Sequence, residues 1–128
     1  MSNVNEEDVA EWLEKEMPEE KTIEDWYTEW DNLIHELSNK EIDLINIKEE
    51  YNQREFEIVY MDKSIDWKEL YGSSSEKVRK QHAVNELQAL VDAKHDLQIS
   101  IDYLKRRIKF IASVMSMQKV LIESEVIE

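Results

Sequence analysis

AVNELQALVDAKHDLQISIDYLKRRIKFIASVMSMQKVLI, residues 83–122, decides the fold of this chain. Read in alternating steps of four and three, this stretch places apolar residues at ten of twelve positions. A stripe that repeats every 3.5 residues stays on one side of an α-helix only if the helix supercoils around another helix. We therefore predict a long helix over residues 76–122 that packs against a second long helix. The twelve stripe positions are Ala83, Leu87, Leu90, Lys94, Leu97, Ile101, Leu104, Ile108, Ile111, Met115, Gln118 and Ile122.

The first half of the chain carries a matching stripe. From Ile23 to Ile65 the same alternation gives eleven apolar residues at thirteen positions, and neither Pro nor Gly interrupts it. Thr22 followed three residues later by Asp25 is a capping signal for the start of a helix. These features predict a first long helix over residues 22–63.

A connector over residues 64–75 separates the two predicted helices and contains the only glycine of the chain, Gly72. We expect Gly72 to end a short helical turn in the left-handed backbone conformation, which glycine adopts without strain. Ser73 and Glu76 form an S-x-x-E capping box for the second helix. Two long helices joined by a short connector predict an antiparallel helical hairpin, in which the numbers of facing residues sum to about 138.

Apolar residues outside both stripes exceed what a single hairpin can bury. We therefore predict a homodimer whose two hairpins form a four-helix bundle. The alternative is that residues around Trp12 fold back over part of this surface within one chain. The surplus residues are Ile34, Ile42, Ile45, Phe56, Ile99, Tyr103, Phe110, Val114, Met117, Val120 and Leu121.

Composition supports an all-α fold, because 128 residues with one Gly, one Pro and 36% charged residues suit long amphipathic helices. The net charge is −14, and residues 1–62 alone carry −15. We expect seven acids of the first helix to form an acidic surface: Glu24, Asp25, Glu29, Asp31, Glu36, Glu49 and Glu50. The total charge disfavours direct nucleic-acid binding, although one basic cluster exists at Lys105, Arg106, Arg107 and Lys109.

Two further sets of residues are candidates for specific roles. Polar residues within an apolar stripe can fix the register of packed helices, and Lys40, Arg54, Lys94 and Gln118 occupy such positions. An acidic N-terminal segment, residues 1–21, precedes the first helix, and an acidic tail occupies residues 123–128. The N-terminal segment places four apolar residues on one side of a short helix, which resembles a ligand for an apolar groove: Val9, Trp12, Leu13 and Met17. Docking of this segment on its own bundle is the alternative.

The sequence offers no pattern for catalysis. The chain has no Cys, its three histidines, His35, His82 and His95, are not predicted to converge, and a single Gly cannot build a phosphate-binding loop. We therefore expect a protein that is not an enzyme and uses neither a cofactor nor a metal. The absence of a signal-peptide pattern and of an apolar run of membrane length predicts a cytoplasmic protein without a membrane partner.

Three stretches, DWKELYG (residues 66–72), EKVRK (76–80) and DYLKRRI (102–108), carry a likeness to known proteins. Residues 64–111 resemble small coiled-coil proteins encoded by phages and prophages of Gram-positive bacteria. The resemblance implies a host-cytoplasm setting and an accessory role, with no catalytic residues. The expected function is an adaptor that binds a host or phage protein, such as one that acts on DNA. The alternative is a nucleic-acid mimic that inhibits a nuclease or a CRISPR-type defence complex.

Overall fold

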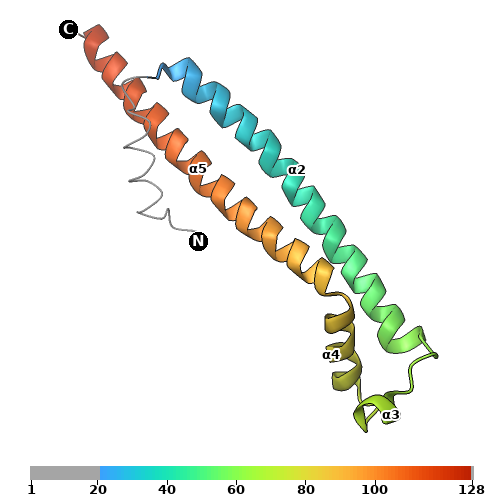
Figure 1. Ribbon diagram of the computed structural model, residues 1–128. Coiled ribbons are helices and arrows are strands. Elements are labelled where there is room, and N and C mark those ends of the chain that lie inside the picture. The colour runs from blue at the N-terminus through green and yellow to red at the C-terminus, as the bar shows by residue number, and fades with distance from the viewer. Residues whose placement is uncertain (1–20, 128) are drawn as a thin grey trace. The chain divides into compact units, whose positions relative to one another are not determined.

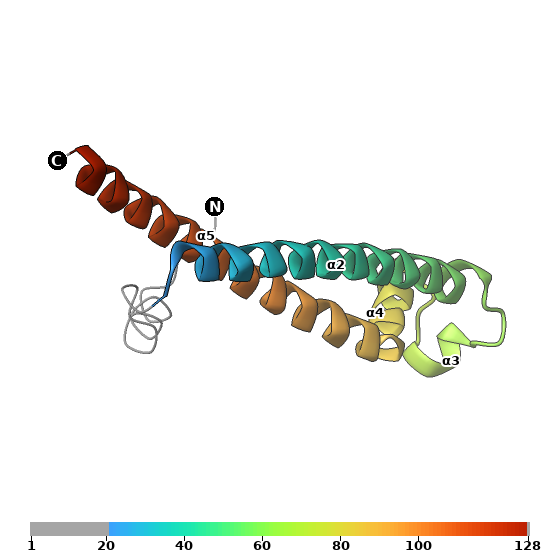
Figure 2. The same ribbon diagram turned by 90° about the horizontal axis from the view of Figure 1, so that it is seen from above.

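The computed structural model describes the backbone of residues 21–127 and the side chains of residues 21–121. Within these residues every regular element is a helix, so the predicted all-α class is confirmed. Figures 1 and 2 show the long helices and the short elements that connect them. The elements are α2 (Ile23–Phe56), the π-helix η2 (Glu57–Met61), α3 (Trp67–Tyr71), α4 (Glu76–Glu86) and α5 (Gln88–Ile127).

The chain forms two compact units, which are described separately. Unit 1 contains the described residues up to Lys40 together with those from Ile99 onward, and unit 2 contains Glu41–Gln98. Helix α2 begins in unit 1 with the predicted cap. The Thr22 N–H donates to Asp25 Oδ2 at 3.2 Å, and the Asp25 N–H donates to Thr22 Oγ1 at 3.1 Å. This reciprocal pair satisfies two backbone donors that the first helical turn leaves open.

In unit 1, α2 and α5 run antiparallel. Lys21 contacts Gln118, and Glu29, further along α2, contacts Arg107, which lies earlier on α5. The numbers in these facing pairs sum to 139 and 136, close to the predicted 138. The predicted register within unit 1 is therefore confirmed.

The core of unit 1 extends beyond the predicted stripe. Trp26 and Ile111 are completely buried, and Phe110 and Val114 are buried beside them. The assignment of Phe110 and Val114 to the surplus surface was therefore wrong. Trp26 explains the difference for Phe110, because its large ring packs edge-on against that ring, with centroids 6.1 Å apart.

In unit 2 the helix that continues α2 changes its geometry. The Asp62 N–H donates to the Glu57 carbonyl oxygen at 2.8 Å, five residues earlier, as in a π-helix. This wider turn holds one residue more than an α-helical turn, so it brings Val59 to the interior, where only 2% of its surface is exposed. The predicted stripe placed Met61 inside, but Met61 is exposed.

The connector of unit 2 confirms the prediction for Gly72. Its φ is +70°, and its N–H donates to the Lys68 carbonyl oxygen at 2.8 Å, which ends α3. The predicted capping role of Ser73 was wrong. Ser75 caps α4 instead, because its backbone is extended directly before the helix and its hydroxyl accepts from the Val78 N–H at 3.3 Å.

The prediction of one helix over residues 76–122 is wrong. The second half of the chain forms two helices, α4 and α5. Leu87 separates α4 from α5 with φ −102° and ψ 23°. The Leu90 N–H donates to the Leu87 carbonyl oxygen at 3.0 Å, a tight three-residue bond that interrupts the α-helical ladder. No Gly or Pro marks this position, and the Leu87 side chain is buried. Helix α5 runs on to Ile127, so residues 123–127 belong to the helix rather than to a separate tail.

Candidate protein-binding surface

An exposed aromatic patch lies where α2 passes into η2. We define it by Phe56, Tyr60 and Met61, whose surfaces are 55%, 54% and 61% exposed. The Phe56 and Tyr60 rings lie side by side, with centroids 5.1 Å apart and a tilt of 47°. Aromatic side chains and Met are enriched in protein interfaces, and π-turns occur often at functional sites. The aromatic patch is therefore a surface suited to contact with another protein.

A polar network holds Tyr60 in place. Its hydroxyl donates to Glu76 Oε1 at 2.7 Å, and the same oxygen accepts from Lys80 Nζ at 3.1 Å. The bond with Tyr60 lowers the pKa of the Glu76 carboxyl, and it raises the pKa of the Tyr60 hydroxyl. Hydrogen bonding to Glu76 in turn raises the pKa of the Lys80 ammonium. The network connects the aromatic patch on η2 to α4.

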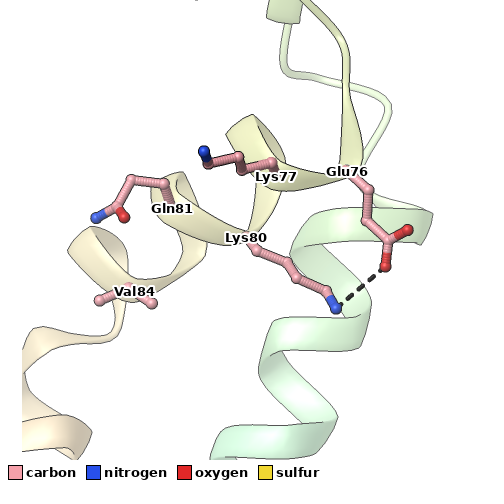
Figure 3. A pocket seen from close by; sticks show the side chains of 5 residues that line it. All are labelled: Glu76, Lys77, Lys80, Gln81 and Val84. Atoms are coloured by element: carbon pink, nitrogen blue, oxygen red, sulfur yellow. Dashed lines mark ion pairs between the residues drawn. The ribbon is translucent and has the colours of Figure 1, made fainter.

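Beside this network, α4 borders an open hollow of about 520 Å³. Figure 3 shows Glu76 and Lys80 extending toward each other, while Lys77 and Gln81 extend away from this pair. The five lining residues come from α4: Glu76, Lys77, Lys80, Gln81 and Val84. A mixture of charged, polar and apolar groups next to exposed rings is typical of the rim of a protein interface.

A cluster of rings in unit 2 packs α3 against α4, and Arg79 links it to η2. The buried Trp67 packs edge-on against His82, with centroids 5.1 Å apart, and the Tyr71 hydroxyl is hydrogen-bonded to His82 Nδ1. The Arg79 guanidinium lies 5.6 Å from the Trp67 ring, and its Nη1 donates to the Val59 carbonyl oxygen at 3.1 Å. These contacts join η2, which carries Tyr60 and Met61, to α3 and α4. Of the other histidines, His35 and His95 are exposed.

The predicted register residues occupy different environments. The half-buried Gln118 donates from Nε2 to the Lys21 carbonyl oxygen at 3.0 Å, which is a contact across unit 1. Arg54 is exposed and pairs with Glu50 one turn earlier at 3.1 Å, a surface pair that contributes little to register. Lys40 and Lys94 are half-buried, and their register role stays a prediction.

The structure divides the predicted acidic surface. Glu29 is half-buried and accepts from Arg107, while Glu50 is paired with Arg54. Asp31 is half-buried, with its carbonyl oxygen 2.8 Å from His35 Nδ1. The remaining members of the set are also exposed: Glu24, Asp25, Glu36 and Glu49.

The basic cluster is divided in the same way. Arg107 is only 4% exposed, and its Nε and Nη2 donate to Glu29 Oε1 at 3.0 and 2.7 Å. Its guanidinium also lies 5.7 Å from the Trp26 ring. Lys105 and Lys109 are exposed, and Arg106 is half-buried. Arg107 is thus part of the interior of unit 1 rather than of a basic surface.

Sequence reasoning missed the aromatic patch as a unit. Phe56 was assigned to the surplus and Met61 to the stripe, because both assignments continued an α-helical period through η2. The four-residue spacing of Phe56 and Tyr60 was the available signal. The predicted binding residues Val9, Trp12, Leu13 and Met17 lie outside the described residues.

Comparisons with known proteins identify no relative of this chain. No family model, curated protein or solved structure matches this chain. Among the described side chains of residues 21–121, no three His, Asp or Glu residues gather in a way that could hold a metal ion. No helix within residues 21–127 has the length and apolar character that crossing a membrane requires.

Proposed function

We propose that this chain is a non-enzymatic adaptor that binds another protein through the aromatic patch. The observation that carries the proposal is the exposure of Phe56, Tyr60 and Met61 at a π-turn that is joined to α3 and α4. Water-exposed rings held in fixed positions lose little conformational entropy on binding, so they are effective anchors. The setting we propose is the cytoplasm of a bacterial host, with the chain as a phage-type accessory protein.

The adaptor proposal predicts that truncating the patch abolishes partner capture. In a pulldown from host lysate, with captured proteins identified by mass, we expect the double substitution F56A/M61A to lower recovery of the main partner at least about tenfold, as loss of interface anchors does. Both side chains are exposed, so the fold should tolerate the change. The matched control is Y27A, which removes an exposed ring from the same helix. Equal recovery by both variants would contradict the proposal.

Nucleic-acid mimicry is the second candidate, and the charge of α2 favours it. Helix α2 contains ten acids and three bases, a net charge of −7, and several acids are exposed. Under this candidate the partner is a basic nuclease or defence complex, and the acids replace phosphates. Capture should then fall steeply between low and high salt and should be blocked by added DNA. An adaptor anchored by the aromatic patch should keep its partner under both conditions.

We also propose that the chain self-associates as a dimer, with two hairpins in a four-helix bundle. Ile42 and Ile45 support this proposal, because they are 52% and 55% exposed on the side of α2 opposite to the half-buried Leu44 and Ile47. They precede Phe56 by more than ten residues, about 16 Å of helix, so the two surfaces can be used together.

The dimer proposal predicts that charging this face produces monomers. In sedimentation equilibrium we expect wild type to have twice the mass of the chain and I42E/I45E to have its single mass, because buried carboxylates oppose association. The control K48E changes the net charge by the same amount from another side of α2 and should remain dimeric. A wild-type protein that is monomeric at every concentration would rule out the dimer.

A further inference from the structure

A second apolar stripe runs along α5 in unit 1, beside the face that packs on α2. Its residues recur at spacings of three, four and seven, which places them on one side of the helix. The middle of the stripe is buried, whereas Ile99, Met117 and Leu121 are each more than half exposed. Its buried members, Phe110 and Val114, belong to the core around Trp26, and we call the exposed members the outer stripe: Ile99, Tyr103, Met117 and Leu121.

The outer stripe lies in a basic environment. Residues 99–121 contain five bases and one acid, a net charge of +4, although the overall charge of the chain is −14. Arg106 is half-buried one turn after Tyr103 on the side of the stripe, and the exposed Lys109 flanks it, whereas the exposed Lys105 projects from another side of α5. A ligand for this face should therefore combine apolar anchors with negative charge.

Lys21, the first described residue of unit 1, lies beside the outer stripe of α5. The Lys21 carbonyl oxygen accepts from Gln118 Nε2 at 3.0 Å, and Lys21 Nζ lies 4.4 Å from the Trp26 ring. Lys21 is therefore held next to the C-terminal part of the outer stripe. Ile99 lies nineteen residues before Gln118, about 28 Å along the helix, and a helix of twenty residues is about 30 Å long. Residues 1–20 are long enough to reach the whole stripe.

The sequence of residues 1–20 has the required chemistry. It contains eight acids and one base, a net charge of −7, together with the apolar residues Val9, Trp12, Leu13 and Met17. We infer that residues 1–20 bind in cis to the outer stripe of α5, with their apolar residues on the stripe and their acids near Arg106 and Lys109. A segment that starts beside Gln118 and reaches toward Ile99 lies parallel to α5.

This contact goes beyond the proposed adaptor function, because it uses a different surface, in unit 1. A short tether gives an intramolecular ligand an effective concentration in the millimolar range, so even weak contacts keep the stripe covered. Any protein that binds the outer stripe, or that takes Trp12 as its anchor, must first displace the segment. The segment therefore acts as an internal competitor for ligands of α5.

The test uses the full chain with a nitroxide label. The chain has no native Cys, so A10C provides one labelling site that is neither an anchor nor a charge. We expect amide signals of residues 99–121 to lose most of their intensity in the labelled protein relative to its reduced form. The additional substitutions W12A/L13A should restore those signals, and they leave the described helices unchanged in sequence.

A mixing experiment distinguishes the occupants. Chain that carries the nitroxide but no nitrogen-15 is combined with chain that carries nitrogen-15 but no nitroxide. Signal loss only in the sample whose chains carry both the nitroxide and nitrogen-15 supports binding in cis. Equal signal loss in the mixture means that a second copy supplies the segment, and it overturns the inference. Intact signals over residues 99–121 in both samples would also overturn it. Because the aromatic patch is unaltered, partner capture by A10C can be measured separately, and its loss would not produce either result.

Discussion

Replacing Trp26 with alanine should lower the free energy of unfolding by about 3–5 kcal/mol, the cost typical of removing a large buried ring. Trp26 is completely buried, packs edge-on against Phe110 and lies beneath the charged groups of Lys21 and Arg107. Its removal leaves a cavity at the point where α2 and α5 of unit 1 are joined, and the surrounding helices can close it only in part. Urea denaturation followed by circular dichroism measures the change.

Tyr27 provides the matched control for Trp26. It is the next residue of α2, it is also aromatic, and 57% of its surface is exposed. The substitution Y27A should change the free energy of unfolding by no more than about 0.5 kcal/mol, because surface substitutions seldom do more. If W26A and Y27A lowered stability equally, burial of Trp26 could not be what holds unit 1 together.

The substitution E29Q should cost about 2 kcal/mol, below the range for breaking a fully buried ion pair because the Glu29 carboxylate is about one-third exposed. The Arg107 guanidinium is buried, and two of its nitrogens donate to one carboxylate oxygen. Glutamine keeps the size of the side chain but removes the charge that balances Arg107 in the interior. The expected loss is therefore electrostatic, and denaturant unfolding at low and high salt should show a similar difference because the pair is shielded from ions.

The control for E29Q is the same chemical change in an exposed pair. Glu50 pairs with Arg54 along the surface of α2 at 3.1 Å. The substitution E50Q should cost no more than about 0.5 kcal/mol, the usual value for such helix pairs. If E29Q lowered the free energy of unfolding no more than E50Q, the pair of Glu29 with Arg107 would contribute no more to stability than a surface pair.

The features predicted correctly depend on local chemistry or on repeated patterns. The all-α class follows from long stripes without Gly or Pro, and the Thr22 cap and the Gly72 turn follow from residue types with one strong backbone preference. The contact between Arg107 and Glu29 agrees with the predicted register because the stripes on both helices set the same alignment. These features need no knowledge of which side chain is largest.

The features predicted wrongly depend on details that a periodic pattern averages out. Ser73 and Ser75 offer the same hydroxyl, and only the path of the connector decides that Ser75 caps α4. Leu87 fits the stripe, yet the helix breaks there. The aromatic patch was not predicted, because a strict α-helical period assigns Phe56 and Met61 to different faces of the helix. Within the candidate surface, the sequence analysis considered Phe56 and Met61, but it identified neither Tyr60 nor the grouping of the three residues.

The extra residue in the η2 turn shows that the number of residues in this segment decides which side chains are exposed. One residue added to a helical turn rotates everything after it by about 100°. At η2 this rotation turns Val59 inward and leaves Tyr60 and Met61 outside, although all three are apolar. An insertion or deletion of a single codon in this segment would therefore exchange interior and exterior residues without substituting any of the neighbouring amino acids. In a protein built from helices, such a change offers evolution a way to replace one binding face by another in a single step.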